Sequence, residues 1–73
     1  MHYKEVISVN RIREYRIAKG LSQTELARLS GVARPNLNRI ELGKATPMLS
    51  SAVKISETLG ATLDELFPIE KGE

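Results

Sequence analysis

The segment GVARPNLNRI, residues 31–40, carries two arginines and two asparagines at spacings that suit a short helix. At about 100° per residue, one face of that helix collects the apolar side chains of Ala33, Leu37 and Ile40. The opposite face collects Arg34, Pro35, Asn38, Arg39 and Leu42, with Asn36 on its flank. The apolar face must pack against the rest of the chain, so the polar face is expected to point outward.

These outward groups have the chemistry needed to read the edges of nucleic-acid bases. A guanidinium donates two hydrogen bonds to guanine O6 and N7, and a carboxamide pairs with adenine N6 and N7. The arginines and the amide are expected near the amino-terminal end of the helix, the end that commonly enters a major groove. We therefore expect Arg34, Asn38 and Arg39 to contact bases. The alternative is that they are solvated surface side chains.

The remainder of the sequence predicts five helices joined by short turns. The expected ranges are residues 9–19, 22–30, 34–42, 46–59 and 62–67. The segment HYKEVISV, residues 2–9, is β-branched enough for a strand, although it is short and terminal. We expect one all-α domain over residues 1–73, with its core over about residues 9–67.

Two helix starts carry the reciprocal pattern of a capping box. Ser22 is followed three residues later by Glu25, and Thr62 is followed three residues later by Glu65. In each pair the hydroxyl can accept from the backbone N–H of the glutamate, while the carboxylate accepts from the backbone N–H of the cap. These pairs predict where the second and fifth helices begin.

Prolines mark two further helix starts. Proline disfavours helical geometry at the residue before it, so Arg34 is expected as an N-cap and Pro35 as the first helical residue. Thr46 and Pro47 are likewise expected to open the fourth helix.

The second and third helices have the spacing of a helix-turn-helix. A capped helix of about nine residues is followed by a turn of about three that contains Gly31, and then by another short helix. The positive end of the second helix suits a phosphate group, and Gln23 in its first turn adds a side-chain donor. Lys44, just beyond the third helix, is placed to reach a neighbouring phosphate.

The stretch GLSQTELARLSGVARPNLNRIELGK, continued by TPMLSSAVKISETLGATLDELF, resembles the Cro/phage-repressor family of xenobiotic-response-element-type helix-turn-helix domains. The resemblance covers about residues 9–67. It implies a compact five-helix, lambda-repressor-like domain whose second and third helices form the helix-turn-helix. It further implies a transcriptional regulator that binds a palindromic operator on double-stranded DNA as a homodimer.

The resemblance also implies roles for single residues. The base-reading positions are Arg34, Pro35, Asn38 and Arg39. The positions near the DNA backbone are Gln23, Asn36 and Lys44. An arginine of the first helix and a glutamate of the third form a structural ion pair in the family, here Arg16 and Glu41. Two departures stand out, because Ala33 replaces a serine or threonine cap and Pro35 offers a base only an apolar contact.

Charge is divided unevenly along the chain. The net charge is +2, but residues 11–44 hold eight basic and three acidic side chains, whereas residues 45–73 hold two basic and five acidic ones. A basic half is typical of a protein that meets a polyanion.

Other function classes lack the residues that they need. There is no cysteine, and His2 is the single histidine. Without these groups or a clustered carboxylate pair, we expect no enzyme, metal site, cofactor or small-molecule ligand. No apolar run approaches a membrane span and no secretory signal is evident, so a cytoplasmic, nucleoid-associated protein is expected.

Five apolar residues near the two ends leave an open choice. They are Val6, Ile7, Leu66, Phe67 and Ile69. They either form a dimer interface or close the bottom of the core.

The third helix leaves a second alternative open, because its outward arginines would also suit an acidic protein. A DNA-binding repressor is therefore weighed against an antitoxin or protein-interaction module that uses the same surface.

Overall fold

The computed structural model describes residues 10–68, which form five helices without a strand. The helices are α2 (Ile12–Ala18), α3 (Gln23–Ser30), α4 (Arg34–Glu41), α5 (Leu49–Leu59) and α6 (Leu63–Leu66). The all-α prediction is confirmed for this part of the chain. The possible strand at residues 2–9, the expected helix start at Val9, and Val6, Ile7 and Ile69 lie outside the described residues.

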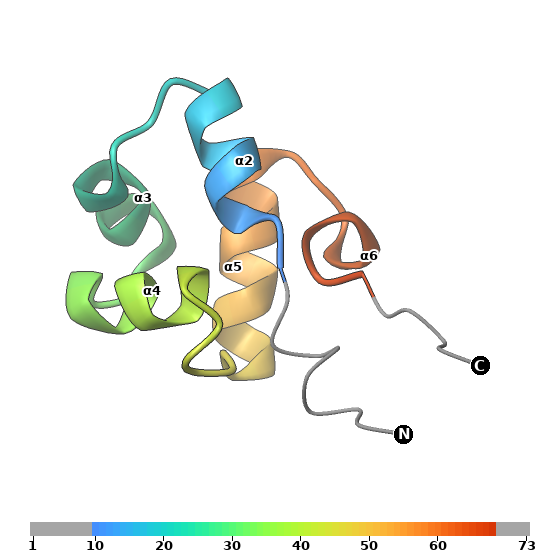
Figure 1. Ribbon diagram of the computed structural model, residues 1–73. Helices are drawn as coiled ribbons and strands as arrows, with labels where there is room; N and C mark the ends of the chain where they lie inside the picture. Colours follow the sequence, from blue (N-terminus) through green and yellow to red (C-terminus); the bar gives the residue numbers. More distant parts are fainter. Residues whose placement is uncertain (1–9, 69–73) are drawn as a thin grey trace.

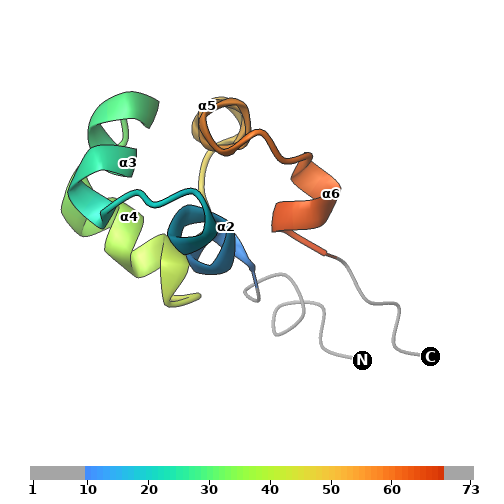
Figure 2. The ribbon, with the colours of Figure 1, turned by 90° about the horizontal axis from the view of Figure 1, so that it is seen from above.

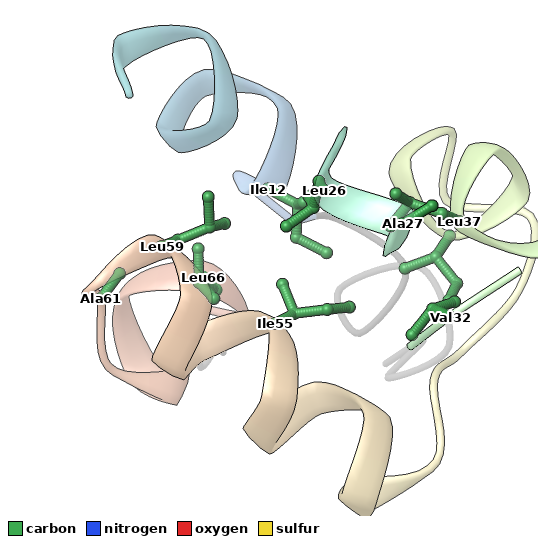
Figure 3. Packing of buried hydrophobic residues seen from close by; sticks show 10 residues of the cluster. Ile12, Leu26, Ala27, Val32, Leu37, Ile55, Leu59, Ala61 and Leu66 are labelled. Atoms are coloured by element: carbon green, nitrogen blue, oxygen red, sulfur yellow. The ribbon is translucent and has the colours of Figure 1, made fainter. Parts of the chain in front are cut away.

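The helices surround one apolar core to which each contributes (Figure 3). The fully buried large side chains are Ile12, Leu26, Leu37, Ile40, Ile55 and Leu66. α3 packs against both α4 and α5, and α6 packs against α5. Figures 1 and 2 agree that α3 and α4 lie on one side of the molecule and α6 on the other. The helix-turn-helix is therefore not covered by α6.

Leu66 decides part of the choice left open at the ends of the chain. Its side chain is fully buried within this single molecule, which places it in the core, the second of the two alternatives. α6 has only four residues, and Leu66 is its inward-facing side chain that closes one end of the core. Phe67 is partly buried against the same cluster.

Both capping boxes are present. The Ser22 hydroxyl accepts from the Glu25 N–H at 3.0 Å, and the Glu25 carboxylate accepts from the Ser22 N–H at 2.8 Å. Thr62 and Glu65 repeat the pattern at 3.0 and 2.8 Å. Hydrogen bonds from the backbone and side chain of Ser22 lower the pKa of the Glu25 carboxyl, with a further contribution from the Arg28 charge. The predicted starts of α3 and α6 are thus confirmed.

The start of α4 differs from the expectation. Ala33, with φ −59° and ψ 138°, is the N-cap, and Arg34 is already helical. The Ala33 carbonyl accepts the first helical hydrogen bond from Leu37 N–H at 2.8 Å, so Pro35 takes the second position. Proline is tolerated there because first-turn N–H groups have no partner within the helix. The expectation that Ala33 packs inward with Leu37 and Ile40 is wrong, because Ala33 precedes the helix and is exposed. Val32 is the buried residue of the turn.

The start of α5 is later than predicted, whereas that of α4 is one residue earlier. Met48 has extended geometry, with φ −65° and ψ 156°, and acts as an N-cap without a side-chain hydrogen bond. Helical residues begin at Leu49, so Thr46 and Pro47 belong to the connection from α4. None of the helices within residues 10–68 has the length and apolar character to cross a membrane.

Candidate nucleic-acid interface

The turn between α3 and α4 is held by one glycine in the left-handed conformation and one buried residue. Gly31 ends α3 with a φ of +75°, a conformation that side-chain-bearing residues rarely adopt. Val32 then points into the core, where it lies beside Leu37 (Figure 3). This three-residue turn fixes α4 against α3, as a helix-turn-helix requires.

α4 separates apolar and polar side chains as the sequence predicts. Leu37 and Ile40 are fully buried. The exposed residues of the helix are Arg34, Pro35, Asn36, Asn38 and Arg39. Because the apolar side chains of α4 pack into the core, its other face presents guanidinium and amide donors to a ligand.

The two arginines of α4 occupy different ends of the helix. Arg34 is its first residue and, with Gln23, Pro35 and Asn38, lines a hollow of about 280 Å³. Arg39 lies in the last turn, where its Nη2 donates to the Lys44 carbonyl at 3.4 Å. The expectation that both arginines lie near the amino-terminal end is therefore right for Arg34 and wrong for Arg39. The helix has only about two turns, so the five positions between Arg34 and Arg39 are enough to place them in its first and last turns.

Gln23 is directed toward α4. It is half-buried, and its Nε2 donates to Asn38 Oδ1 at 3.2 Å and to Glu41 Oε1 at 3.3 Å. Both amide hydrogens therefore have partners within the protein. Sequence reasoning did not find these contacts, because they join residues 15 and 18 positions apart on separate helices.

An ion pair lies behind this network. Arg16 of α2 donates from Nε to Glu41 Oε2 at 2.8 Å and from Nη2 to Glu41 Oε1 at 3.2 Å. Arg16 Nη1 also donates to the Leu21 carbonyl at 3.0 Å. The side chains are 12% and 3% exposed, so the pair is shielded from solvent. This matches the structural pair that the family resemblance implies.

A second hollow, of about 490 Å³, opens next to the ion pair. Its lining residues are Arg13, Arg16, Gln23, Asn38, Glu41 and Leu42. Sequence reasoning gave Arg13 no individual role, yet the structure brings it to the same side as Asn38. Leu42 is 60% exposed here. Asn36 and Lys44 are exposed as well. Among residues 10–68, no three histidine, cysteine, aspartate or glutamate side chains come together as a metal site would need.

This fold and surface define a class of protein. A short capped helix, a three-residue turn and a second helix with an outward polar face form a helix-turn-helix DNA-binding unit. The chain belongs to the Cro-type, xenobiotic-response-element-type helix-turn-helix family, whose model matches residues 12–66. It is a DNA-binding transcriptional regulator of that family.

Individual relatives agree with this assignment. An uncharacterized HTH-type transcriptional regulator from Archaeoglobus fulgidus is 40% identical over 63 residues, covering 86% of this chain and 90% of that protein. Another, from Methanocaldococcus jannaschii, is 36% identical over 64 residues, covering 88% of this chain and 97% of that protein. The solved structure of the restriction-modification controller protein C.AhdI from Aeromonas hydrophila is 38% identical with a TM-score of 0.77, covering 89% of this chain and all of that one.

Proposed function

We propose that this protein is a repressor that binds a palindromic operator as a homodimer, with α4 in the major groove. The observation that carries the proposal is the exposed polar face of α4 opposite the fully buried Leu37 and Ile40. Bound to an operator near a promoter, a domain of this size would act by occupying the site.

The polar residues of α4 and its surroundings divide into two groups by position. Arg34, Pro35, Asn38 and Arg39 are proposed to meet base edges, with Pro35 limited to an apolar contact such as a thymine methyl. Asn36 and Lys44 are proposed to meet the DNA backbone. Gln23 is also proposed to meet the DNA backbone, through its backbone N–H at the positive end of α3. Its side-chain amide is not available, because it already donates to Asn38 and Glu41.

Dimerisation would bring two copies of α4 to successive major grooves, about 34 Å apart. Leu66 is buried in the core, so within residues 10–68 we assign Phe67, which is only partly buried, to the proposed interface. Phe67, Leu63 and the 72% exposed Leu49 line an apolar groove of about 390 Å³ between the start of α5 and α6. A second copy covering this groove would remove Leu49 from water, which favours association. α6, which forms one wall of the groove, lies on the opposite side of the molecule from α3 (Figure 2).

One observation favours a second candidate. Leu42 is 60% exposed next to Arg13 and Asn38, and an apolar side chain among donors also suits a protein partner. In that case the α4 surface would dock an acidic protein, as an antitoxin or interaction module does.

Selection of bound duplexes from a random pool tests the proposal. We expect an enriched palindrome, bound with an affinity that falls steeply as salt increases because phosphate contacts release counterions. An enriched sequence without two-fold symmetry would contradict dimeric binding. No enrichment, together with weak binding that does not respond to salt, would leave the protein-docking candidate in place of the DNA function.

A further inference from the structure

We infer that Asn38 acts as a hydrogen-bond donor alone, and that it selects a base edge presenting only acceptors, guanine O6 and N7 or thymine O4. The inference rests on the proposed function for the presence of DNA. Its physical basis is a chain of hydrogen bonds that begins at the Arg16–Glu41 ion pair and ends at the exposed amide of Asn38.

The first link fixes the orientation of Gln23. Glu41 Oε1 is a carboxylate oxygen in a side chain that is 3% exposed, and it already accepts from Arg16. A carboxylate held by a guanidinium can only accept hydrogen bonds. The part of the Gln23 amide that faces it, at 3.3 Å, must therefore be the NH₂ group, since the amide oxygen would be repelled.

The second link fixes the orientation of Asn38. The same Gln23 nitrogen lies 3.2 Å from Asn38 and uses its second hydrogen there. A donor requires an acceptor, so Oδ1 of Asn38 faces Gln23 and Nδ2 takes the other side. Nδ2 has no hydrogen-bond partner among residues 10–68, and Asn38 is exposed at the hollow that it shares with Arg34. The ion pair thus sets which end of an amide two side chains away is offered to a ligand.

This orientation changes the expected base preference. Pairing with adenine uses both ends of the asparagine amide, because N6 donates to Oδ1 while N7 accepts from Nδ2. With Oδ1 turned toward Gln23, the first of these bonds is lost. Guanine presents two acceptors in the major groove and thymine presents one, whereas cytosine presents only a donor. Guanine or thymine is therefore preferred where Asn38 meets the operator.

The orientation can be measured in the free protein. In the ¹⁵N-labelled full chain, the side-chain amide hydrogens of Gln23 should exchange with water more slowly than those of Asn38, because Gln23 is half-buried and doubly bonded. Slow exchange at Asn38 Nδ2 with fast exchange at Gln23 Nε2 would show the reverse orientation and would overturn the inference. This readout does not depend on DNA.

The base preference is tested by selecting DNA with three variants. In the wild type, the position that responds to Asn38→Asp should hold guanine or thymine, favoured over adenine and cytosine by about fivefold or more. Asn38→Asp converts the donor into an acceptor and should shift that position toward cytosine or adenine. Gln23→Leu releases Oδ1, so adenine should become as acceptable as guanine there.

Asn36→Asp is the matched control, because it makes the same change of charge on the flank of the same helix. It should weaken binding to all sequences through repulsion of phosphate, without altering the position that Asn38 reads. A wild-type preference for adenine at that position, or a Gln23→Leu variant that loses affinity uniformly with its preference intact, would overturn the inference while leaving DNA binding established. If no variant and no wild-type sample enriches any sequence, the proposed function fails and the base preference fails with it.

Discussion

The guanidinium of Arg16 and the carboxylate of Glu41 are joined by two parallel hydrogen bonds, at 2.8 and 3.2 Å, that tie α2 to the last residue of α4. The contact fixes the carboxyl-terminal end of α4 against α2. Because Glu41 also accepts from Gln23, the same carboxylate connects the interior of the domain to its polar surface.

Breaking this pair from one side should destabilise the fold severely. Arg16→Met leaves the Glu41 charge shielded from water without a partner, and we expect the free energy of unfolding to fall by about 3–5 kcal/mol. Urea denaturation followed by circular dichroism measures the change. In the double variant Arg16→Met/Glu41→Leu both charges are absent, so most of the loss should be recovered. An Arg16→Met variant as stable as the wild type would show that the ion pair does not stabilise the fold.

Arg34 and Arg39 should both contribute to binding but differ in what they read. Arg34→Ala and Arg39→Ala are each expected to weaken operator binding by about 1–3 kcal/mol and to relax selection at one base position. Fluorescence anisotropy with operator and random duplexes of equal length measures both effects. Lys54→Ala removes an exposed positive charge from α5 and serves as the control. Equal losses on operator and random DNA would reassign the arginine concerned to the phosphates.

Restoring the missing cap of α4 should stabilise the protein. Ala33 has the extended geometry of an N-cap but no side chain to accept from the first turn. In Ala33→Ser the hydroxyl can accept from the Asn36 N–H, so unfolding should require about 1 kcal/mol more. The wild type is the reference, since alanine keeps the backbone position and supplies no hydroxyl. A serine variant no more stable than the wild type would indicate that the cap is not formed.

Acid should remove the contribution of the first capping box. Hydrogen bonds from Ser22 lower the pKa of Glu25 below its ordinary value of 4.5. A carboxyl whose pKa is depressed by folding stabilises the protein above its unfolded pKa, and this stabilisation is lost as pH falls through the folded value. Glu25→Gln keeps an acceptor for the Ser22 N–H but cannot titrate.

Thermal unfolding of the two proteins as a function of pH checks this prediction. The wild type should be the more stable at about pH 7, and the difference in midpoint should shrink below about pH 4.5, as the linkage between protonation and folding requires. A difference that stays constant down to about pH 3 would mean that Glu25 titrates alike in the folded and unfolded chains.

Much of the fold could be predicted because its signals are local. The Ser22–Glu25 and Thr62–Glu65 pairs each span three residues, and Gly31 ends α3 through its own backbone conformation. The spacing of Leu37 and Ile40 likewise identified the buried face of α4. The predicted start of α4 is wrong by one residue, because a proline marks the first turn of a helix without fixing its position within that turn. The predicted start of α5 is wrong for another reason, since Pro47 lies before the N-cap Met48 and outside the helix.

The sequence by itself determined the helices, the capping boxes of α3 and α6 and the polar face of α4, because each depends on residues within a few positions of one another. Tertiary structure alone decided that Gln23 bonds to Asn38 and Glu41, that Arg39 turns toward Lys44, and that Leu66 fills the core. Gln23 and Asn38 lie 15 positions apart on two helices, and their distance follows from how those helices pack. Helix packing and the buried charge of Glu41 therefore set the orientation of the Asn38 amide, and with it the base that we propose this residue reads. No local sequence pattern indicates either of them.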